Sequence, residues 1–235
     1  QKGLPGFWEI STTWYFGFQG PIRPKTVCRT RKLPDFSLEE TARSHGHALI
    51  CGIDEAGRGP WAGPVLAGAV ILDKGRLSAM LVAELDDSKK LKPSKREALF
   101  ERLGAEAHIG VGLADVAEID DLNILGATML AMARAVEALP VRPDLALVDG
   151  NREPDLSCPA RCVVRGDAIS LSIAAASIAA KVARDRIMAG LAGDFPGYGW
   201  ERNAGYGTPE HQAALERLGV TPQHRQSYAP IRRLL

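Results

Sequence analysis

The chain is predicted to fold as an α/β domain, in which helices cover the faces of a mixed sheet of about five strands. Short apolar runs bounded by turn residues have the length of buried strands at 48–53, 65–72, 107–114, 145–148 and 162–164. Helical patterns lie between or after these runs, at 93–103, 123–139, 169–191 and 209–218. This interleaving predicts one layered domain with a helical C-terminal extension.

The composition is that of an ordinary globular protein. Of the 235 residues, 46% are hydrophobic and 24% are charged, which is enough apolar material for a full core. The formal net charge is +1, so a nucleic acid would have to bind to a local patch and not through bulk charge. No run approaches the roughly 18 apolar residues of a membrane span. Zinc-type spacing is absent among the cysteines, which predicts reduced thiols in a cytoplasmic protein: Cys28, Cys51, Cys158 and Cys162.

Residues 1–34 differ from the rest of the chain. Aromatic side chains are followed there by a group of basic ones, and four prolines interrupt any helical or alternating period. Segments of this kind tend to lie outside a packed core. We therefore expect a poorly ordered N-terminal appendage over 1–34 and one domain over 35–235. A basic tail that contacts nucleic acid is the alternative interpretation of the appendage.

Three patterns set the expected arrangement of the elements. Only residues 57–64 separate the first two predicted strands, so these strands are expected to pair as an antiparallel hairpin. Asn123 is a plausible N-cap of the second helix, whose apolar side chains share one face: Leu125, Met129, Met132 and Val136. The helix over 169–191 has a buried stripe of the same kind: Leu171, Ala175, Ile178 and Val182.

Acidic side chains follow three of the predicted strands. Asp54 and Glu55 end the first, Asp149 ends the fourth, and Asp167 comes just after the fifth. Strand ends on one edge of a sheet are neighbours, and ligands bind there. At a separation of about 4 Å, two carboxylates repel by roughly 4 kcal/mol at an effective dielectric of about 20. Hard divalent cations relieve this repulsion, and oxygen-only ligands suit Mg²⁺ or Mn²⁺. The pattern predicts a site for two such ions.

Each acid also has a simpler interpretation when it is taken alone. The Asp54–Glu55 pair and Asp149 could be solvated turn residues, and Asp167 could favour the dipole of the long helix. Adjacent residues of a regular strand also point to opposite faces of the sheet. Glu55 can therefore join Asp54 only if the strand ends or bends at residues 56–57.

Several motifs occur in order along residues 35–235 and together make the sequence resemble bacterial ribonuclease HII, the type 2 ribonuclease H. They are GIDEAGRGP at 52–60, DSKKL at 87–91, VDG at 148–150, GD at 166–167, AAASIAAKVARD at 174–185 and GYGT at 205–208. Any one of them would be weak, but their order is specific. The resemblance implies a ribonuclease H-like fold and endonucleolytic cleavage of RNA that is paired with DNA.

The resemblance also implies roles for particular residues. The metal-binding acids of the family fall on Asp54, Glu55, Asp149 and Asp167. Its junction-reading motif falls on Gly57, Arg58 and Gly59, and its sugar-stacking tyrosine on Tyr206. Basic side chains within the motifs are candidate phosphate contacts: Lys89, Lys90, Lys181 and Arg184. Alone, the glycine motif would be a tight turn, Tyr206 a packed or surface tyrosine, and each base a solvated charge. The role of His211 stays open, with an exposed residue in the first turn of a helix as the simple interpretation.

The leading hypothesis is a monomeric endonuclease that uses two Mg²⁺ or Mn²⁺ ions. Its expected substrates are RNA–DNA hybrids and duplex DNA with embedded ribonucleotides, nicked 5′ of the ribonucleotide to leave 3′-hydroxyl and 5′-phosphate ends. One alternative is a nuclease like ribonuclease HIII, which has no such junction preference. The glycine-arginine-glycine sequence at 57–59 argues against this alternative. The other is a non-catalytic hybrid-binding module. Four clustered acids argue against it, because anions do not help to bind phosphates.

Overall fold

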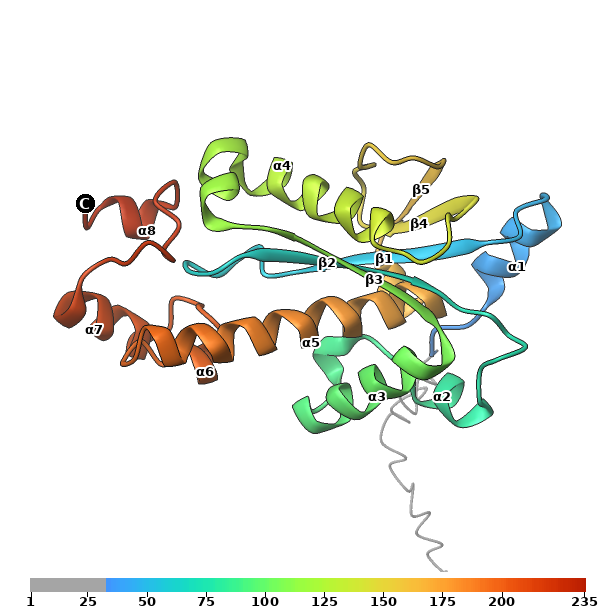
Figure 1. The fold of residues 1–235 in the computed structure, drawn as a ribbon, viewed down its shortest axis with the longest axis horizontal. Coiled ribbons are helices and arrows are strands. Elements are labelled where there is room, and N and C mark those ends of the chain that lie inside the picture. The colour runs from blue at the N-terminus through green and yellow to red at the C-terminus, as the bar shows by residue number, and fades with distance from the viewer. Residues whose placement is uncertain (1–32) are drawn as a thin grey trace, which may run out of the picture. The chain divides into compact units, whose positions relative to one another are not determined.

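A five-stranded mixed sheet forms the centre of the fold in a computed structural model that describes residues 33–235 (Figure 1). The strands are β1 (Ile50–Ala56), β2 (Val65–Ile71), β3 (His108–Ala114), β4 (Leu145–Asp149) and β5 (Ala160–Val163), in the order β3-β2-β1-β4-β5. The predicted hairpin is confirmed, because β1 and β2 pair antiparallel. β1 also pairs parallel with β4, and β4 with β5, so their carboxyl ends share one edge.

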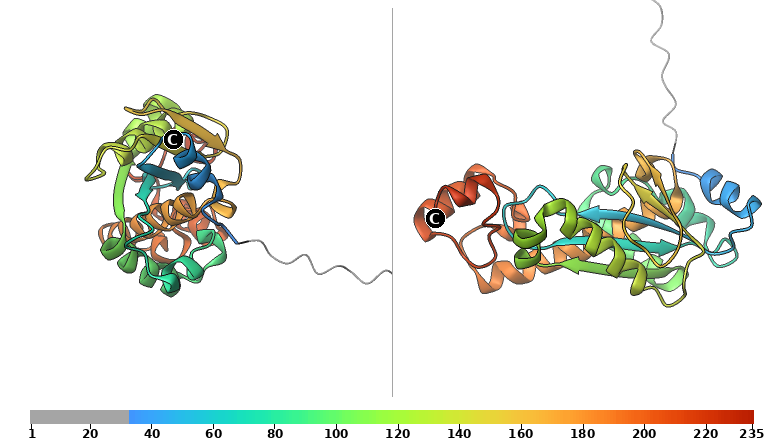
Figure 2. Two further views of the ribbon diagram at one scale, coloured as in Figure 1. Left: turned by 90° about the vertical axis from the view of Figure 1, so that its right-hand side faces the viewer. Right: turned by 90° about the horizontal axis from the view of Figure 1, so that it is seen from above.

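Helices cover both faces of this sheet (Figures 1 and 2). The helices of the described residues are α1 (Ser37–Ser44), α2 (Ala79–Glu84), α3 (Pro93–Glu106), α4 (Val116–Glu137), α5 (Leu171–Asp194), α6 (Trp200–Asn203), α7 (Pro209–Leu218) and α8 (Ala229–Arg232). Two short 3₁₀ turns are η1 (Ser88–Lys90) and η2 (Gly166–Ala168). One apolar core joins α4 to the sheet and a second joins α5 and α3 to the other face, while α6–α8 enclose a third. The predicted α/β class and C-terminal helical extension are confirmed.

Glycines on the strands let both covering helices lie very close to the sheet. A Cβ atom on Gly52 of β1 would lie 2.1 Å from the backbone carbon of Ser172 in α5. A Cβ atom on Gly112 of β3 would lie at the same distance from the Ala131 carbonyl oxygen of α4. The facing residues of both helices are largely alanine, whose small side chains permit this approach. Asp54 lies two residues after Gly52 on the same face of β1, so it also faces α5.

Helix α4 begins seven residues before the predicted start. Asp115 is its N-cap, in a capping box with Glu118. Asn123 lies inside it with φ 59°, a left-handed conformation that kinks the helix, and its side chain accepts hydrogen bonds from the Leu125 and Gly126 amides. The capping role of Asn123 was predicted, but the turns before it were not. Leu125, which was expected on the buried face, is 37% exposed.

The N-terminus of α5 is anchored by a buried glutamate of α1. Ser170 is the N-cap of α5, and Glu39 Oε1 accepts hydrogen bonds from the Ser170 and Ser172 hydroxyls and from the Ser172 amide. Asp35 adds a parallel bridge to Ser170. Because these contacts fix the start of α5, they also fix the position of its later residues along the sheet.

The predicted appendage over 1–34 lies almost entirely outside the described residues. Within them, Pro34 is already buried. Cys51, Cys158 and Cys162 are free thiols, as the cysteine spacing predicted, and Cys51 packs in the core. Among residues 33–235, no helix has both the length and the apolar character that a membrane crossing requires.

The close approach of α5 to the sheet predicts that Gly52→Ala is strongly destabilising. The new methyl group would meet backbone atoms that have no room to move, and we expect a loss of about 3 kcal/mol in unfolding free energy, at the upper end of what overpacking costs. Gly190 lies in α5, and a Cβ at this position would meet open space. Gly190→Ala should therefore raise the unfolding free energy by about 0.5–1 kcal/mol. Urea denaturation of both variants measures the difference, and equal effects would contradict the close packing.

Candidate active site

Three aspartates meet where β1, β4 and η2 come together. Ile53 pairs with Val148, so the next residues, Asp54 and Asp149, lie side by side at the shared edge. The Gly166 amide donates to Asp149 Oδ1 at 2.6 Å, which brings η2 against the end of β4. Carboxylate oxygens of Asp54, Asp149 and Asp167 all lie within 4.8 Å of one another. The predicted convergence of these three acids is found in the structure.

The electrostatics of this cluster suit a divalent cation. Asp54 is only 3% exposed, and burial followed by the charges of Glu55 and Asp149 raises its pKa well above the usual range. Burial also raises the pKa of Asp149, which the charge of Asp167 reinforces. Buried oxygen ligands that repel one another are the donor set that Mg²⁺ or Mn²⁺ satisfies. The residues present therefore fit hard divalent ions.

Glu55 stands apart from the three aspartates. β1 continues regularly to Ala56, so Glu55 shares a face with Cys51 and Ile53, which pack toward α4, while Asp54 faces α5. The strand does not end before Glu55, and alternation sends its side chain to the other face. Its carboxylate accepts from Arg58 Nη1 at 3.2 Å. Glu55 still borders the same hollow as Asp54, so it lies beside the cluster without joining it.

A hollow of about 250 Å³ opens beside the acids and contains both specificity elements that the sequence indicated. The loop Gly57–Arg58–Gly59 forms one wall and Tyr206, which is 48% exposed, forms another. The two walls lie close together, since a Cβ on Gly59 would lie 3.3 Å from the Tyr206 ring. Gly57 has φ +100° and no room for a Cβ, which would lie 2.0 Å from Arg184 Nε, so only glycine fits there.

The four predicted phosphate contacts differ in their surroundings. Lys89 lines the hollow, with Nζ 3.6 Å from Asp167 Oδ2. Burial lowers its pKa, but the charges of four aspartates together outweigh burial and raise it: Asp54, Asp167, Asp87 and Asp149. Lys181 also lines the hollow and donates to Asp185 at 2.5 Å. Lys90 is outside this lining and pairs with Asp86 and Asp87.

Arg184 lines the hollow but is turned toward the protein. It is 1% exposed, and its guanidinium donates to the backbone carbonyls of Ala62, Pro64 and Ala204. Burial, followed by the nearby charge of Arg225, lowers its pKa to about 10. The structure thus gives Arg184 a supporting contact behind the loop, where the sequence had suggested a direct phosphate contact.

Sequence reasoning missed a second buried arginine, Arg225, and its neighbour Tyr228. Arg225 is fully buried and donates to carbonyls of the loop over residues 57–64, and Tyr228 donates to the Arg58 carbonyl. Their partners are more than 160 residues away in the chain. No local spacing or motif signals such a contact, and only the folded backbone brings them together.

The simple interpretation of His211 as an exposed residue is wrong. His211 is fully buried in the first turn of α7, where Trp200 and His224 enclose it. The Thr221 amide donates to His224 Nδ1 at 2.9 Å, so His224 carries its proton on Nε2, which lies 3.1 Å from His211 Nε2. His211 Nε2 also accepts from Trp200, and its Nδ1–H donates to the Tyr206 carbonyl at 3.0 Å. Both imidazoles are therefore neutral.

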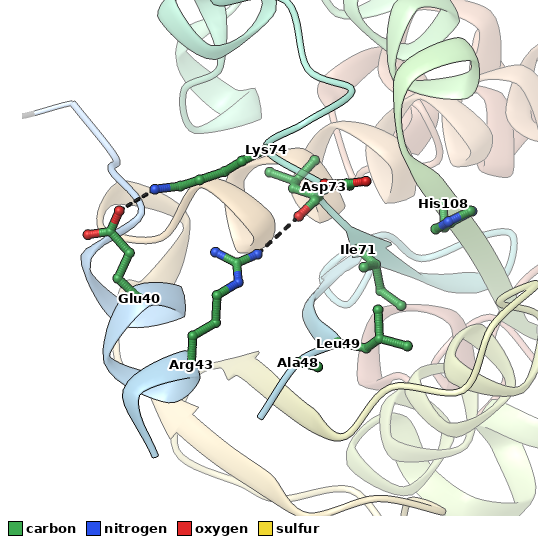
Figure 3. A pocket seen from close by; sticks show the side chains of 9 residues that line it. Glu40, Arg43, Ala48, Leu49, Ile71, Asp73, Lys74 and His108 are labelled. Carbon is green, nitrogen blue, oxygen red and sulfur yellow. Dashed lines mark hydrogen bonds and ion pairs between the residues drawn. The ribbon is translucent and has the colours of Figure 1, made fainter. Parts of the chain in front are cut away.

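A larger hollow, of about 390 Å³, lies at the opposite end of β1 (Figure 3). Lys74 pairs there with Glu40, and Arg43 donates to the Leu72 carbonyl. Its charged groups thus have partners within the protein, and it contains no group of three acids like that at the shared strand edge. Size alone does not locate the chemistry of this protein.

Comparison with solved structures places the fold in a known class. The chain is similar to the ribonuclease H2 of Pyrococcus horikoshii OT3, with 27% identity and a TM-score of 0.67, covering 80% of this chain and 97% of that one. Bst-RNase HIII, solved in complex with Mn²⁺, shares the fold at 19% identity and a TM-score of 0.62, covering 82% and 71% of the two chains. Fold and acid cluster together define a nuclease of the ribonuclease H class.

Sequence comparison narrows the class. Residues 51–231 match the family model of ribonuclease HII. The ribonuclease HII of Rhodospirillum rubrum is 58% identical over 205 residues, which cover 86% of this chain and 92% of that protein. The chain belongs to the ribonuclease HII family, a family of endoribonucleases.

The buried histidine pair predicts a loss of stability in mild acid. Burial, followed by the electrostatic effect of the neighbouring His211, lowers the pKa of His224 to about 4, so the unfolded chain binds this proton at a higher pH than the native protein does. The stabilisation is complete above about pH 6.5 and is lost as the pH falls toward 4, by up to about 3 kcal/mol. His224→Gln keeps an acceptor and a donor but does not titrate.

Unfolding free energies of wild type and His224→Gln at pH 7 and pH 4.5 check this expectation. The wild type should lose more stability than the variant over that interval. Asp54 and Asp149 have raised pKa values, so their protonation stabilises the native protein. This contribution is the same in both proteins and cancels in the comparison. Parallel pH dependence of the two proteins would contradict the neutral, buried state of His224.

Proposed function

We propose that this protein hydrolyses the RNA strand of RNA–DNA hybrids and nicks duplex DNA 5′ of an embedded ribonucleotide, in the cytoplasm. The observation that carries the proposal is that two features lie together in one place. A cluster of three carboxylates borders a hollow whose walls are the Gly57–Gly59 loop and Tyr206. Membership of the ribonuclease HII family supports the same substrate class.

Asp54, Asp149 and Asp167 would hold the metal ions, with Glu55 as a further ligand at the border of the hollow. Two divalent ions would activate a water molecule and stabilise the leaving oxygen. A new bond forms between the water oxygen and phosphorus, the bond from phosphorus to the 3′ oxygen breaks, and that oxygen takes a proton. Lys89 and Lys181 provide positive charge beside the phosphate, and they partly offset the carboxylates.

Junction recognition would come from the loop and Tyr206 acting on consecutive nucleotides. The glycines let backbone groups of residues 57–59 approach a ribose closely, and a 2′-hydroxyl both donates and accepts hydrogen bonds. The exposed Tyr206 ring, which lies close to Gly59, would pack on the next sugar. A hydroxyl on that sugar would crowd the ring, so an RNA-to-DNA step is favoured over continuous RNA.

Two other functions fit less well. A nuclease like ribonuclease HIII shares the fold, but the family match and the Gly57–Arg58–Gly59 sequence favour ribonuclease HII. A non-catalytic hybrid-binding module would gain nothing from three clustered carboxylates, two of them buried, facing the phosphates of its ligand. Divalent-dependent cleavage of a duplex with one embedded ribonucleotide separates these possibilities.

Asp54→Asn tests the acid cluster. The variant should fold but lose several orders of magnitude of cleavage activity, because a shared metal ligand is gone. Without metal it should melt at a higher temperature than wild type, because one buried repelling charge is removed. Asp144→Asn is the control, since Asp144 caps the Ala48 and Leu49 amides at the other end of β1. Normal cleavage by folded Asp54→Asn would refute the metal site.

Tyr206→Ala tests junction recognition. Loss of one stacking contact should cost about 1–3 kcal/mol, or roughly tenfold to a hundredfold in kcat/KM, on a single embedded ribonucleotide. The loss on a long hybrid should be smaller, and divalent ions should still bind, because no ligand has been changed. Tyr206→Phe keeps the ring and should keep most of the activity. If Tyr206→Ala loses equally on both substrates, the junction is read elsewhere.

A further inference from the structure

The Gly57–Gly59 loop does not hold its own shape. It contains two glycines, and Gly57 is in the left-handed region, so the loop would be mobile without outside support. Arg225 provides that support with all five of its N–H donors. They reach the carbonyls of Gly57 at 2.6 Å, Arg58 at 3.0 Å, Gly63 at 2.9 Å and Pro64 at 3.1 Å, and the Tyr228 hydroxyl at 3.0 Å.

These contacts decide which groups of the loop face the hollow. In a trans peptide the C=O and the following N–H point in opposite directions. The Gly57 and Arg58 carbonyls point back to Arg225, so the amides of Arg58 and Gly59 point the other way. The Tyr228 hydroxyl accepts from Arg225 and donates to the Arg58 carbonyl, which fixes the second of these peptide planes. The Arg58 and Gly59 amides are thus directed away from Arg225, on a loop that lines the hollow.

Residues 224–228, the short segment that contains Arg225, also support Tyr206, the other wall of the hollow. His224, next to Arg225, contacts His211, which donates to the Tyr206 carbonyl. Asp120 in the first part of α4 accepts from the Gln226 and Ser227 amides and so anchors the segment to the sheet layer. Residues 224–228, which we name the clamp segment, therefore contact the Gly57–Gly59 loop directly and support Tyr206 through His211.

We propose that the clamp segment is a positioning element for ribonucleotide recognition, in which Arg225 and Tyr228 direct the Arg58 and Gly59 amides toward the substrate ribose. The inference rests on the proposed function. None of the clamp residues touches the acid cluster through a hydrogen bond that the structure shows, so the clamp should affect the choice of substrate more than the hydrolysis step. It keeps the loop amides at a fixed spacing from Tyr206.

Tyr228→Phe is the appropriate variant, because removal of the buried Arg225 could unfold the protein. The ring over the Arg225 guanidinium is retained, at 5.2 Å, and only the hydroxyl is lost. Loss of this hydrogen-bond pair should lower kcat/KM on a single embedded ribonucleotide about threefold to tenfold, mainly through KM. Activity on a long hybrid should change less than about twofold, within the effect of an ordinary surface change.

Tyr198→Phe is the matched control. Its hydroxyl also donates to a backbone carbonyl in the C-terminal region, that of Gly219 at 2.8 Å, but it does not contact the loop. This variant should leave the ratio of kcat/KM on the two substrates unchanged. Melting temperatures of both variants are measured alongside.

The outcomes separate the two levels of inference. A reduced ratio for Tyr228→Phe, with an unchanged ratio for Tyr198→Phe, supports the clamp. An unchanged ratio for Tyr228→Phe, an equal loss on both substrates, or the same shift in both variants overturns it while the proposed function stands. If the wild type fails to cleave either substrate with Mg²⁺ or Mn²⁺, the proposed function itself is refuted.

Discussion

The site depends on how closely α5 lies against the sheet. Gly52 and Gly68 leave no space between the strands and this helix, and Glu39 fixes the helix start. Lys181 and Arg184, about three and about three and a half turns along α5, are thereby brought to the edge where β1 ends. A looser contact would move these cations away from Asp54. Packing in the centre of the domain thus fixes the geometry at its edge.

Charge is distributed unevenly around the hollow although the chain as a whole is nearly neutral. The carboxylate cluster lies on one side. Behind the loop lie Arg184 and Arg225, whose hydrogen bonds go to backbone carbonyls and a tyrosine hydroxyl. Burial lowers the pKa of both, yet they remain cations at neutral pH. Positive potential is thus placed where a polyanion would enter, without the net basic charge that bulk binding requires.

The sequence predicted the parts of the site that follow from short-range pattern. Apolar runs located the strands, and the rule for strand ends brought Asp54 to Asp149. The position of Glu55 depended on where β1 ends, which a pattern leaves open by a residue or two. His211 was misplaced because its burial comes from Trp200 and His224. The clamp was invisible for the same reason, since its contacts join distant parts of the chain and leave no periodic signal.

The long reach of the clamp has a consequence for how the enzyme matures. The contacts of Arg225 to Gly57 and Arg58 span 168 and 167 residues, so they close only after nearly the whole chain has left the ribosome. The three aspartates are all synthesised well before residue 225. A nascent or C-terminally shortened chain would thus contain every carboxylate of the acid cluster before the Gly57–Gly59 loop has its support. The proposed discrimination between RNA and DNA is in this sense the last property that the folding chain would acquire.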